Sequence, residues 1–386
     1  LLAVLPGTGG LTRVVDKRHV RRDRADFFST LIEGIKGKRA VEWGLVDRVY
    51  PTSQFKDAVA KRAKEVAAMS DRPASGPGVT LHPLNPTVTE STITYSAVTL
   101  AVNRTKRTAE LTVHAPTGPQ PSTIEDIVKA GDQFWPLRAF RELDDALLRL
   151  RINELEIGTV IVRTEGDMDA VLAIDETLVA HQSHWLVREI VLMMKRTLKR
   201  MDLTARTFFA LIDEGSAFGG SLFELALAAD RSYMFHDDAE ENVIALSPMN
   251  FGPLPMSNGL TRLQTRFLGD EEKIAALEAD ARVKGSRYNA GDAEEAGLVT
   301  FAPDEIDWDD EIRQAIEARA AFSPDAMTGM EANLRFAGPE TMETKIFGRL
   351  TAWQNWIFQR PNAVGEKGAL QSYGQQGRPE FDWKRT

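Results

Sequence analysis

The sequence predicts an α/β layered fold that occurs in two copies, and three observations support this prediction. Short apolar strands alternate with amphipathic helices between residues 98 and 212, an order typical of α/β folds. Two stretches roughly 250 residues apart share short sequences in the same order, which indicates domain duplication rather than a solenoid. The composition, 43% hydrophobic and 27% charged over 386 residues, is that of a globular protein with room for two domains.

Two landmarks define the internal repeat. Gly-Leu-Thr-Arg occurs at residues 10–13 and again at 259–262, and Gly-Leu-Val occurs at 44–46 and again at 297–299. The landmarks lie 34 residues apart in the first copy and 38 in the second, with helix-like sequence between them. The shared order and the similar spacing together indicate a duplicated structural unit.

The repeat, together with the positions of the prolines and glycines, predicts four segments. Residues 1–70 are expected to be the C-terminal part of a first unit, because their opening runs at once into a glycine turn and the unit therefore looks N-terminally incomplete. Residues 71–90 are expected to be a linker, since 71–86 contains four prolines and two glycines, which interrupt regular structure. Residues 91–300 are the expected core of a second unit, and 301–386 a C-terminal helical packing region.

The spacing of apolar residues predicts the elements of the second unit. Alternation of apolar with polar or small residues indicates a half-buried strand, and apolar residues three or four apart indicate an amphipathic helix. The predicted elements are a strand pair at 98–102 and 109–113, a helix over 140–150, a buried strand at 159–162, a helix over 186–198 and a buried strand at 208–212.

A glycine turn follows the last of these strands. The chain from Thr207 reads as a buried strand, a turn of small residues at 215–220 and a helix rich in Leu and Ala, an order that directs free backbone N–H groups beyond the strand end. Because glycine allows close approach, a carbonyl oxygen could reach the N–H of Gly220. The alternative is that Gly219 and Gly220 form only a tight turn. Dinucleotide and P-loop patterns do not occur.

The same segment carries a family resemblance. AFGGSLFELALAAD, at 217–230, resembles the crotonase (enoyl-CoA hydratase/isomerase) segment Ala-Phe-Gly-Gly-Gly-Leu-Glu-Leu-Ala-Leu-Ala-x-Asp, and PGTGGLTR with the later GLVDRV resembles a second landmark of that superfamily. The resemblance covers most of the chain apart from the linker. It implies a crotonase-type spiral of ββα turns in tandem copies, and an acyl-CoA substrate. It further implies that two backbone N–H groups hold the thioester oxygen and that one or two glutamates move protons.

Position by position, the resemblance implies roles for residues of the second copy. Gly220 corresponds to the second oxyanion donor and Ala173 to the first, although Ile174 stands where the family has glycine. Glu224 corresponds to the first catalytic glutamate only if one residue is inserted after Gly220, and Pro248 stands in place of the second glutamate. The second copy is therefore expected to be catalytically degenerate, with a structural role.

In the first copy, the resemblance places the catalytic glutamates upstream of Leu1. It implies that Gly7, Gly9 and Gly10 help to form the wall of an acyl-CoA site, as it implies for Gly219 in the second copy. The resemblance implies no metal and no redox cofactor, and coenzyme A is expected only as part of the substrate.

Two fused units, together with the charged run at Asp16–Arg24, resemble one branch of the superfamily. That branch opens the epoxide of 2,3-epoxybenzoyl-CoA, adds water and cleaves the ring, releasing formate and an aldehyde CoA thioester in aerobic benzoate degradation. The alternatives are a generic enoyl-CoA hydratase or isomerase, and a non-catalytic CoA-binding or oligomerisation fragment. The charged run itself either contacts CoA phosphates or forms a solvated helix face with internal ion pairs.

Histidines and aromatic residues offer further candidates. His181 and His184 lie three apart on a predicted helix, a spacing that suits a metal, but we interpret them as surface or packing residues. Trp353, Trp356 and Phe358 either line an aromatic substrate pocket or dock a C-terminal helix.

Composition limits the partners and the compartment. A net charge of −9 argues against a nucleic-acid binder, and no apolar stretch reaches the ~18 residues of a membrane span. The absence of cysteine is compatible with a reducing cytoplasm. The family resemblance implies a homo-oligomer.

Overall fold

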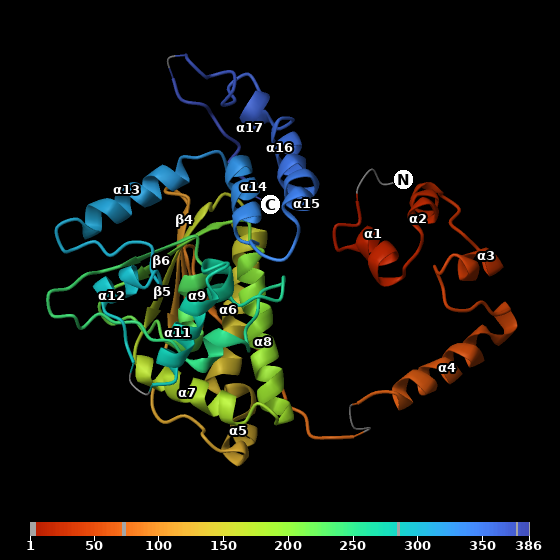
Figure 1. Ribbon diagram of the computed structural model, residues 1–386, viewed down its shortest axis with the longest axis horizontal. Helices are drawn as coiled ribbons and strands as arrows, with labels where there is room; N and C mark the ends of the chain where they lie inside the picture. The colour runs from red at the N-terminus through yellow and green to blue at the C-terminus, as the bar shows by residue number, and fades with distance from the viewer. Residues whose placement is uncertain (1–4, 72–74, 284–285, 376, 386) are drawn as a thin grey trace. The chain divides into compact units, whose positions relative to one another are not determined.

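A computed structural model of the chain describes residues 5–71, 75–283, 286–375 and 377–385. The chain divides into two compact units, Leu1–Gly78 and Val79–Thr386 (Figure 1). None of the helices in the described part is long and apolar enough to cross a membrane.

The first unit consists of helices around a small core. Val20, Ala25 and Ala40 are buried, and the rings of Phe27 and Trp43 pack edge to face with centroids 5.8 Å apart. The helices are α1 (Gly10–Thr12), which continues into a π-helix (Arg13–Lys17), α2 (Arg22–Thr30), α3 (Gly37–Glu42) and α4 (Thr52–Ala68).

The charged run Asp16–Arg24 is not a single helix. It covers the end of the π-helix, a turn, and the start of α2. The turn contains His19, whose φ of 53° lies in the left-handed region and interrupts the helix. Arg21 pairs with Asp23 at 2.6 Å, and both side chains are exposed. The internal ion pair agrees with the interpretation of the run as a solvated surface.

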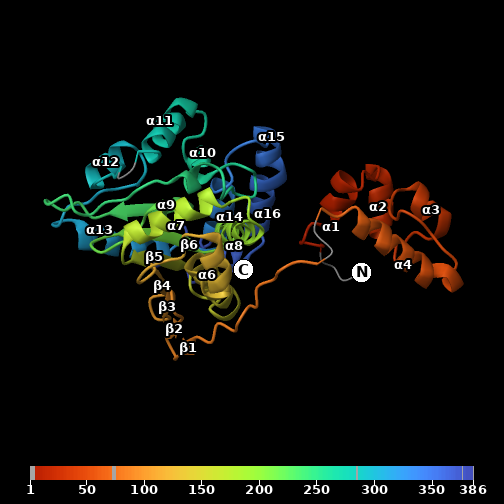
Figure 2. The ribbon, with the colours of Figure 1, turned by 90° about the horizontal axis from the view of Figure 1, so that it is seen from below.

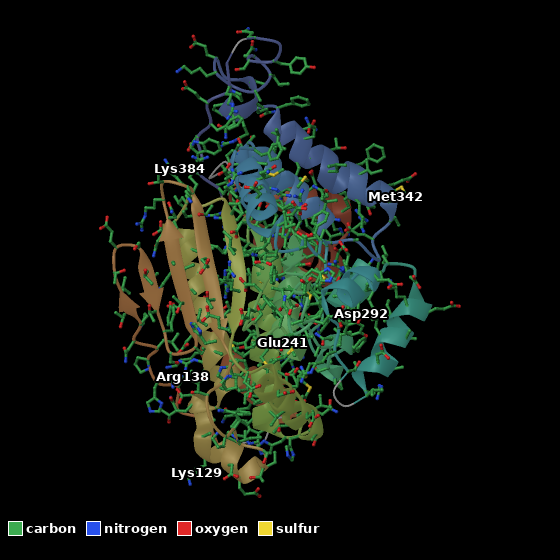
Figure 3. The ribbon with its side chains drawn as sticks, turned by 90° about the vertical axis from the view of Figure 1, so that its left-hand side faces the viewer. Lys129, Arg138, Glu241, Asp292, Met342 and Lys384 are labelled. Carbon is green, nitrogen blue, oxygen red and sulfur yellow. The ribbon has the colours of Figure 1, made fainter. Side chains whose placement is uncertain are left out.

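The second unit is built on a seven-stranded sheet whose strands follow one another in chain order. The pairs from β1 to β4 are antiparallel and those from β4 to β7 are parallel. Figure 3 shows the first strands of the sheet, in orange, at one edge of this unit. The four predicted strands are confirmed as β3 to β6. The strands are β1 (Thr87–Val88), β2 (Thr92–Thr94), β3 (Val98–Asn103), β4 (Thr108–His114), β5 (Thr159–Glu165), β6 (Thr207–Ile212) and β7 (Arg231–Met234).

Helices cover the sheet and form the C-terminal region, and the two predicted helices are confirmed as α6 and α8. Short 3₁₀ turns also occur at Gly131–Gln133 and Pro248–Phe251. The helices are α5 (Ile124–Ala130), α6 (Trp135–Asn153), α7 (Met168–Ala180), α8 (Trp185–Asp202), α9 (Gly220–Ala228), α10 (Arg262–Arg266), α11 (Glu271–Ala281), α12 (Ala290–Glu295), α13 (Trp308–Ala320), α14 (Pro324–Leu334), α15 (Met342–Lys345), a π-helix (Ile346–Leu350), α16 (Thr351–Ile357) and α17 (Pro361–Val364).

Strand β6 is buried on both of its faces, which explains its uninterrupted apolar sequence. Successive side chains of a strand point to opposite sides. Phe208 and Ile212 therefore join the main core, to which α6 and α8 contribute, whereas Phe209 and Leu211 pack with Ile312 of α13. Helix α9 contacts both β6 and α7, and Figure 2 shows the three elements near one another. This arrangement sets the start of α9 against α7.

The sequence repeat is also a structural repeat. In the first unit the Gly-Leu-Thr-Arg landmark precedes α2, α3 and α4, and in the second unit it precedes α11, α12 and α13. Gly44 and Gly297 end α3 and α12 with φ of 76° and 70°, the left-handed helix end that favours glycine. Their N–H groups donate to the carbonyl three residues earlier in both cases, those of Val41 and Glu294.

The prediction that His181 and His184 share a helix is wrong. Helix α7 ends at Ala180, and the two histidines lie in the turn that leads to α8. His181 Nε2 lies 3.1 Å from the carbonyl oxygen of Ser122, and His184 precedes the first residue of α8. Across the described ranges, no group of three or more His, Cys, Asp or Glu side chains is arranged to hold a metal ion.

The aromatic residues near the C-terminus dock a helix. Trp353 and Trp356 of α16 pack edge to face at 5.5 Å, and Trp353 lies against Gly329 of α14. Phe358 follows the helix and is about half exposed. The structure therefore agrees with the docked-helix interpretation.

Candidate functional site

The predicted Gly-Gly turn lies where the chain leaves β6 and enters α9. Gly219 is extended, whereas Gly220 has φ 48°, in the left-handed region that glycine tolerates. Gly219 forms a parallel bridge with Ala245, and the N–H of Gly220 donates to the Ala245 carbonyl at 2.9 Å. The N–H group that was predicted to hold a thioester oxygen is therefore already bonded within the protein.

The carboxyl group of Asp175, on α7, fills the space beside this turn. Its Oδ2 accepts the backbone N–H of Ser221 at 2.7 Å and the hydroxyl of Ser247 at 2.7 Å. A Cβ atom at position 220 would lie 2.0 Å from the same oxygen. Glycine is thus required at 220 by the approach of a neighbouring side chain, with no ligand involved.

Asp175 is wholly buried, and no cation pairs with it in the described part of the chain. Burial raises the pKa of its carboxyl group to about 6, while the bonds from Ser221 and Ser247 act in the opposite direction. The negative charge of Glu224 contributes to the rise. The group therefore titrates well above the ordinary range of an aspartate.

Gly219 also lies close to helix α7, against residues other than Asp175. A Cβ atom there would lie 2.5 Å from Cγ of Met168 and 3.4 Å from Cδ2 of Leu172. Both of those residues belong to α7, and Met168 is buried. The two glycines therefore let α7 pack closely against the start of α9.

Glu224, the candidate for the first catalytic glutamate, is held in a buried ion pair. Its Oε2 accepts Nη1 of Arg262 at 2.8 Å, and its Oε1 accepts Nδ2 of Asn250 at 2.8 Å. Arg262 also bonds both oxygens of Asp202, at 2.7 and 3.2 Å. Burial raises the pKa of Glu224, and the charge of Arg262 opposes that rise. A carboxylate whose two oxygens are bonded to buried groups is poorly placed to take a proton from a substrate.

Sequence reasoning missed Asn250, which joins these two sets of contacts. Its Nδ2 donates to the Gly220 carbonyl at 2.9 Å, and its Oδ1 accepts the Ser247 N–H at 2.9 Å. Ser247 and Asn250 form a capping box around the 3₁₀ turn. The signal was present as a serine followed by proline and, three residues on, by an amide. At the position expected for the second glutamate, the chain therefore has Pro248, the first residue of a capped 3₁₀ turn, and no carboxylate.

Ala173 lies inside α7, where backbone N–H groups donate to the carbonyl four residues earlier. Its own carbonyl accepts the hydroxyl of Thr177 at 2.9 Å. Its side chain is exposed, whereas the neighbouring Ile174 is buried in the core. The structure does not bring an unbonded Ala173 N–H to the Gly-Gly turn.

The first-copy glycines build the turn that opens α1. The N–H of Gly7 donates to Leu5 at 2.8 Å, and those of Gly9 and Gly10 donate to Pro6 at 3.0 and 3.2 Å. Gly9 has φ 95°, which requires glycine. These residues form a compact turn, and their part in a ligand site stays a prediction.

Comparisons with known proteins place the chain among characterised sequences and folds. No family model matches the chain. It is 52% identical over all 386 residues to benzoyl-CoA-dihydrodiol lyase of Aromatoleum evansii and spans 69% of that protein.

The solved structures that match include enoyl-CoA hydratases. One from Geobacillus kaustophilus aligns with a TM-score of 0.52 and 16% identity over 74% of this chain and 97% of its own. Another, from Mycobacterium smegmatis, aligns with a TM-score of 0.50 and 15% identity over 74% of this chain and 98% of its own. These likenesses show the fold.

Proposed function

The chain belongs to the benzoyl-CoA-dihydrodiol lyase family of the crotonase superfamily, and from this premise we propose that it acts in ring cleavage of 2,3-epoxybenzoyl-CoA. The predicted family, fold class and lyase class are confirmed. In the proposed reaction the epoxide is opened, water is added and the ring is cleaved, so that formate and an aldehyde CoA thioester leave. The observation that carries this proposal is the identity of 52% along the whole chain.

We infer that the second unit contributes structure rather than reacting groups. Its Gly220 N–H is bonded to Ala245, and Glu224 is paired with Arg262. Pro248 supplies no carboxylate at the position of the second glutamate. An oxyanion site needs donors aimed at empty space where the substrate oxygen will lie, and the Ala245 carbonyl lies in front of the Gly220 N–H here.

The reacting carboxylates are therefore proposed to belong to the first crotonase unit, upstream of Leu1. Carboxylates beside a ring polarised by a thioester are suited to activate water and to relay protons. The proposed steps are the addition of two water molecules, proton transfers and cleavage of ring C–C bonds, with no net oxidation or reduction. We therefore propose no metal or redox cofactor, with coenzyme A entering as part of the substrate.

A parallel assay separates the lyase from a generic hydratase. The full-length natural protein is given 2,3-epoxybenzoyl-CoA and, separately, crotonyl-CoA, and formate and hydrated product are measured. Formate from the first substrate supports the proposal, whereas hydration of crotonyl-CoA alone refutes it. If the chain is instead a non-catalytic CoA-binding fragment, the 386-residue chain is expected to bind benzoyl-CoA without turnover.

Glu224→Gln in the full-length protein tests the role of the second unit separately. We expect formate production within about twofold of the parent, because Glu224 faces Arg262 and not a substrate. A loss of a hundredfold or more, in a variant that remains folded, would overturn the structural role while leaving the lyase assignment intact. Homo-oligomeric assembly and a cytoplasmic location remain proposals, for sedimentation and cell fractionation of the full-length protein to decide.

A further inference from the structure

A cavity of ≈ 450 Å³ opens in the second unit between the end of α9, α10 and α14. This volume lies in the range of small-molecule sites, about 300–1,000 Å³. Cationic side chains outnumber carboxylates in its lining by five to three. The arginines are Arg231, Arg262, Arg266, Arg319 and Arg335.

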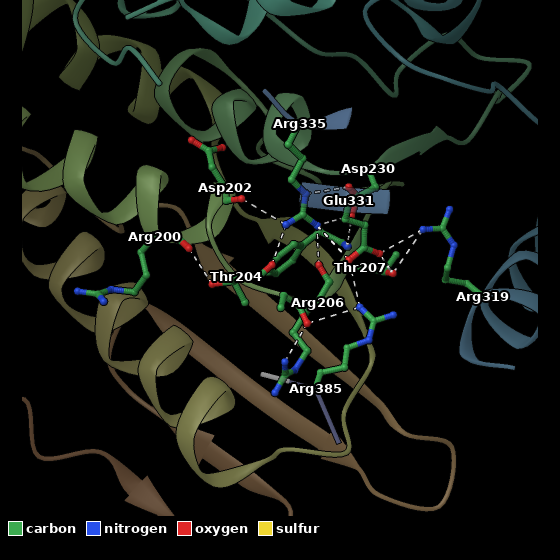
Figure 4. Close-up of polar contacts among 12 residues, drawn as sticks. Arg200, Asp202, Thr204, Arg206, Thr207, Asp230, Arg319, Glu331, Arg335 and Arg385 are labelled. Carbon is green, nitrogen blue, oxygen red and sulfur yellow. Dashed lines mark hydrogen bonds and ion pairs between the residues drawn. The ribbon is translucent and has the colours of Figure 1, made fainter. Parts of the chain in front are cut away.

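The carboxylates of the lining are already neutralised. Asp230 is held by both the Nε and the Nη2 of Arg335, at 2.9 and 2.6 Å (Figure 4). Asp202 is held in the same two-point manner by Arg262. Glu331 accepts Nη1 of Arg385 at 3.1 Å. These pairs use Arg262 and Arg335, and Glu331 also pairs with Arg319 at 3.4 Å. In the described part of the chain, Arg231 and Arg266 are therefore the lining arginines without a carboxylate partner.

Arg266 and Arg231 have no ion-pair partner in the described part of the chain. The Nε of Arg266 donates to the carbonyl of Gly297 at 2.5 Å, and its two terminal nitrogens form no hydrogen bond with the described residues. Burial lowers the pKa of Arg266, and no carboxylate acts in the opposite direction. Within the described residues, the guanidinium of Arg231 forms one hydrogen bond, a long one of 3.5 Å to the hydroxyl of Tyr233.

Arg319 is a third cation of the lining, and it shares its carboxylate partner, Glu331, with Arg385. Its guanidinium carbon lies 5.2 Å from the ring centroid of Phe209, and that of Arg231 lies 5.5 Å from the same ring. Its Nη1 pairs with Oε1 of Glu331 and donates to the hydroxyl of Thr207, each at 3.4 Å. The like charges of Arg231 and Arg319 near one ring repel each other, and the three carboxylates of the lining do not balance its five arginines. An anion in the cavity would supply the missing charge.

The rest of the wall decides what kind of anion fits. It is largely apolar, with side chains of Leu227, Met256, Met330 and Leu334. Guanidinium groups bind carboxylate and phosphate oxygens at two points, and an apolar wall favours a ligand that carries hydrocarbon. We propose that this cavity binds a small organic anion, in which a carboxylate or phosphate head contacts Arg231, Arg266 and Arg319 and an apolar body of about one ring lies on the apolar wall.

Calorimetric titration of the 386-residue chain at low salt tests the proposal with four probes. Benzoate and phenyl phosphate carry both a head and a body, and they distinguish a carboxylate source from a phosphate source. Benzamide carries the body without the charge, and inorganic phosphate carries the charge without the body. We expect one of the first two to bind at least about tenfold more tightly than either of the others.

Variants separate the site from general surface charge. Arg231→Met and Arg266→Met are each expected to weaken binding about tenfold or more, because a charged hydrogen bond is lost. Arg282→Met is the matched control, since Arg282 is exposed and pairs with Glu278 away from the cavity. Leu334 is 67% exposed, so substitutions there should not disturb folding. Leu334→Glu is expected to weaken binding severalfold and Leu334→Lys is not.

Three results would overturn the proposal. The first is no saturable heat from benzoate or phenyl phosphate up to about 10 mM. The second is benzamide or inorganic phosphate binding as tightly as the better of those two probes. The third is binding that Arg231→Met, Arg266→Met and Leu334→Glu all leave unchanged, which would place the ligand elsewhere on the protein. The proposal does not depend on the ring-cleaving reaction.

Discussion

Asp175 makes the stability of the second unit depend on pH, and one substitution should remove that dependence. Burial raises the pKa of its carboxyl group to about 6, compared with about 3.9 in an unfolded chain. The folded state therefore binds this proton more tightly than the unfolded state does. The resulting stabilisation is complete below about pH 4 and is lost as the pH rises through about 6. A difference of about two pKa units corresponds to roughly 3 kcal/mol.

Asp175→Asn replaces the carboxyl group by a neutral group of the same shape. The amide oxygen can accept the Ser221 N–H and the Ser247 hydroxyl, as Oδ2 does. We expect the variant and the parent to have similar free energies of unfolding near pH 4.5. At pH 7.5 the variant should be more stable than the parent by up to about 3 kcal/mol, because only the parent has to bury a charged group.

Urea unfolding of the 386-residue chain, followed by tryptophan fluorescence between pH 4.5 and 8, measures this difference. All tryptophans except Trp43 lie in the second unit, so the signal reports mainly on it. Asp309→Asn, at an exposed position on α13, is the control and should leave the pH profile of the parent unchanged. Parallel profiles for the parent and Asp175→Asn would show that Asp175 is not a buried titrating group.

Three further substitutions have expected outcomes. Gly220→Ala should destabilise the second unit by about 2–4 kcal/mol, because its Cβ would meet Asp175 Oδ2 at 2.0 Å and its φ is 48°. Arg385→Met should cost about 3 kcal/mol, since it removes a cation 3.1 Å from the buried carboxylate of Glu331. Glu224→Gln should lower the free energy of unfolding by about 1–3 kcal/mol, because a charged bond becomes a neutral one. Urea unfolding at pH 7 checks all three.

Matched changes make these results interpretable. Gly215→Ala, at another glycine with positive φ but with nothing within 4 Å of its Cβ, separates backbone strain from the clash at Gly220. Lys367→Met removes an exposed cation from Glu380 and should be nearly neutral. Equal losses from Gly220→Ala and Gly215→Ala would contradict the role given to Asp175, and a neutral Arg385→Met would contradict the pairing with Glu331.

Local sequence sufficed for much of the fold. The apolar runs of β5 and β6 and the alternation of β3 and β4 report burial directly, so these strands were predictable. The end of α7 was not, because the residues from Ala180 to His184 include no glycine or proline. His181 and His184 were therefore placed on a helix that stops before them.

The candidate site depended on contacts between distant parts of the chain. The turn at Gly220 was recognised, but its N–H partner, Ala245, and its close neighbour, Asp175, lie far from it in sequence. Nothing in the pattern around Asp175 distinguishes it from an ordinary acidic residue on a helix. Whether a backbone N–H is free or already bonded depends on tertiary packing, which a short sequence motif does not encode.

The contact between Gly220 and Asp175 also limits which substitutions this unit can accept at either position. A larger residue at 220 is barred while Asp175 is present, because the two would overlap. Loss of Asp175 alone would leave the buried Ser221 N–H and Ser247 hydroxyl without the acceptor they now share. The presence of each residue thus makes a single non-isosteric substitution of the other unfavourable. A non-isosteric change at either position is therefore expected to cost stability unless the other position changes with it.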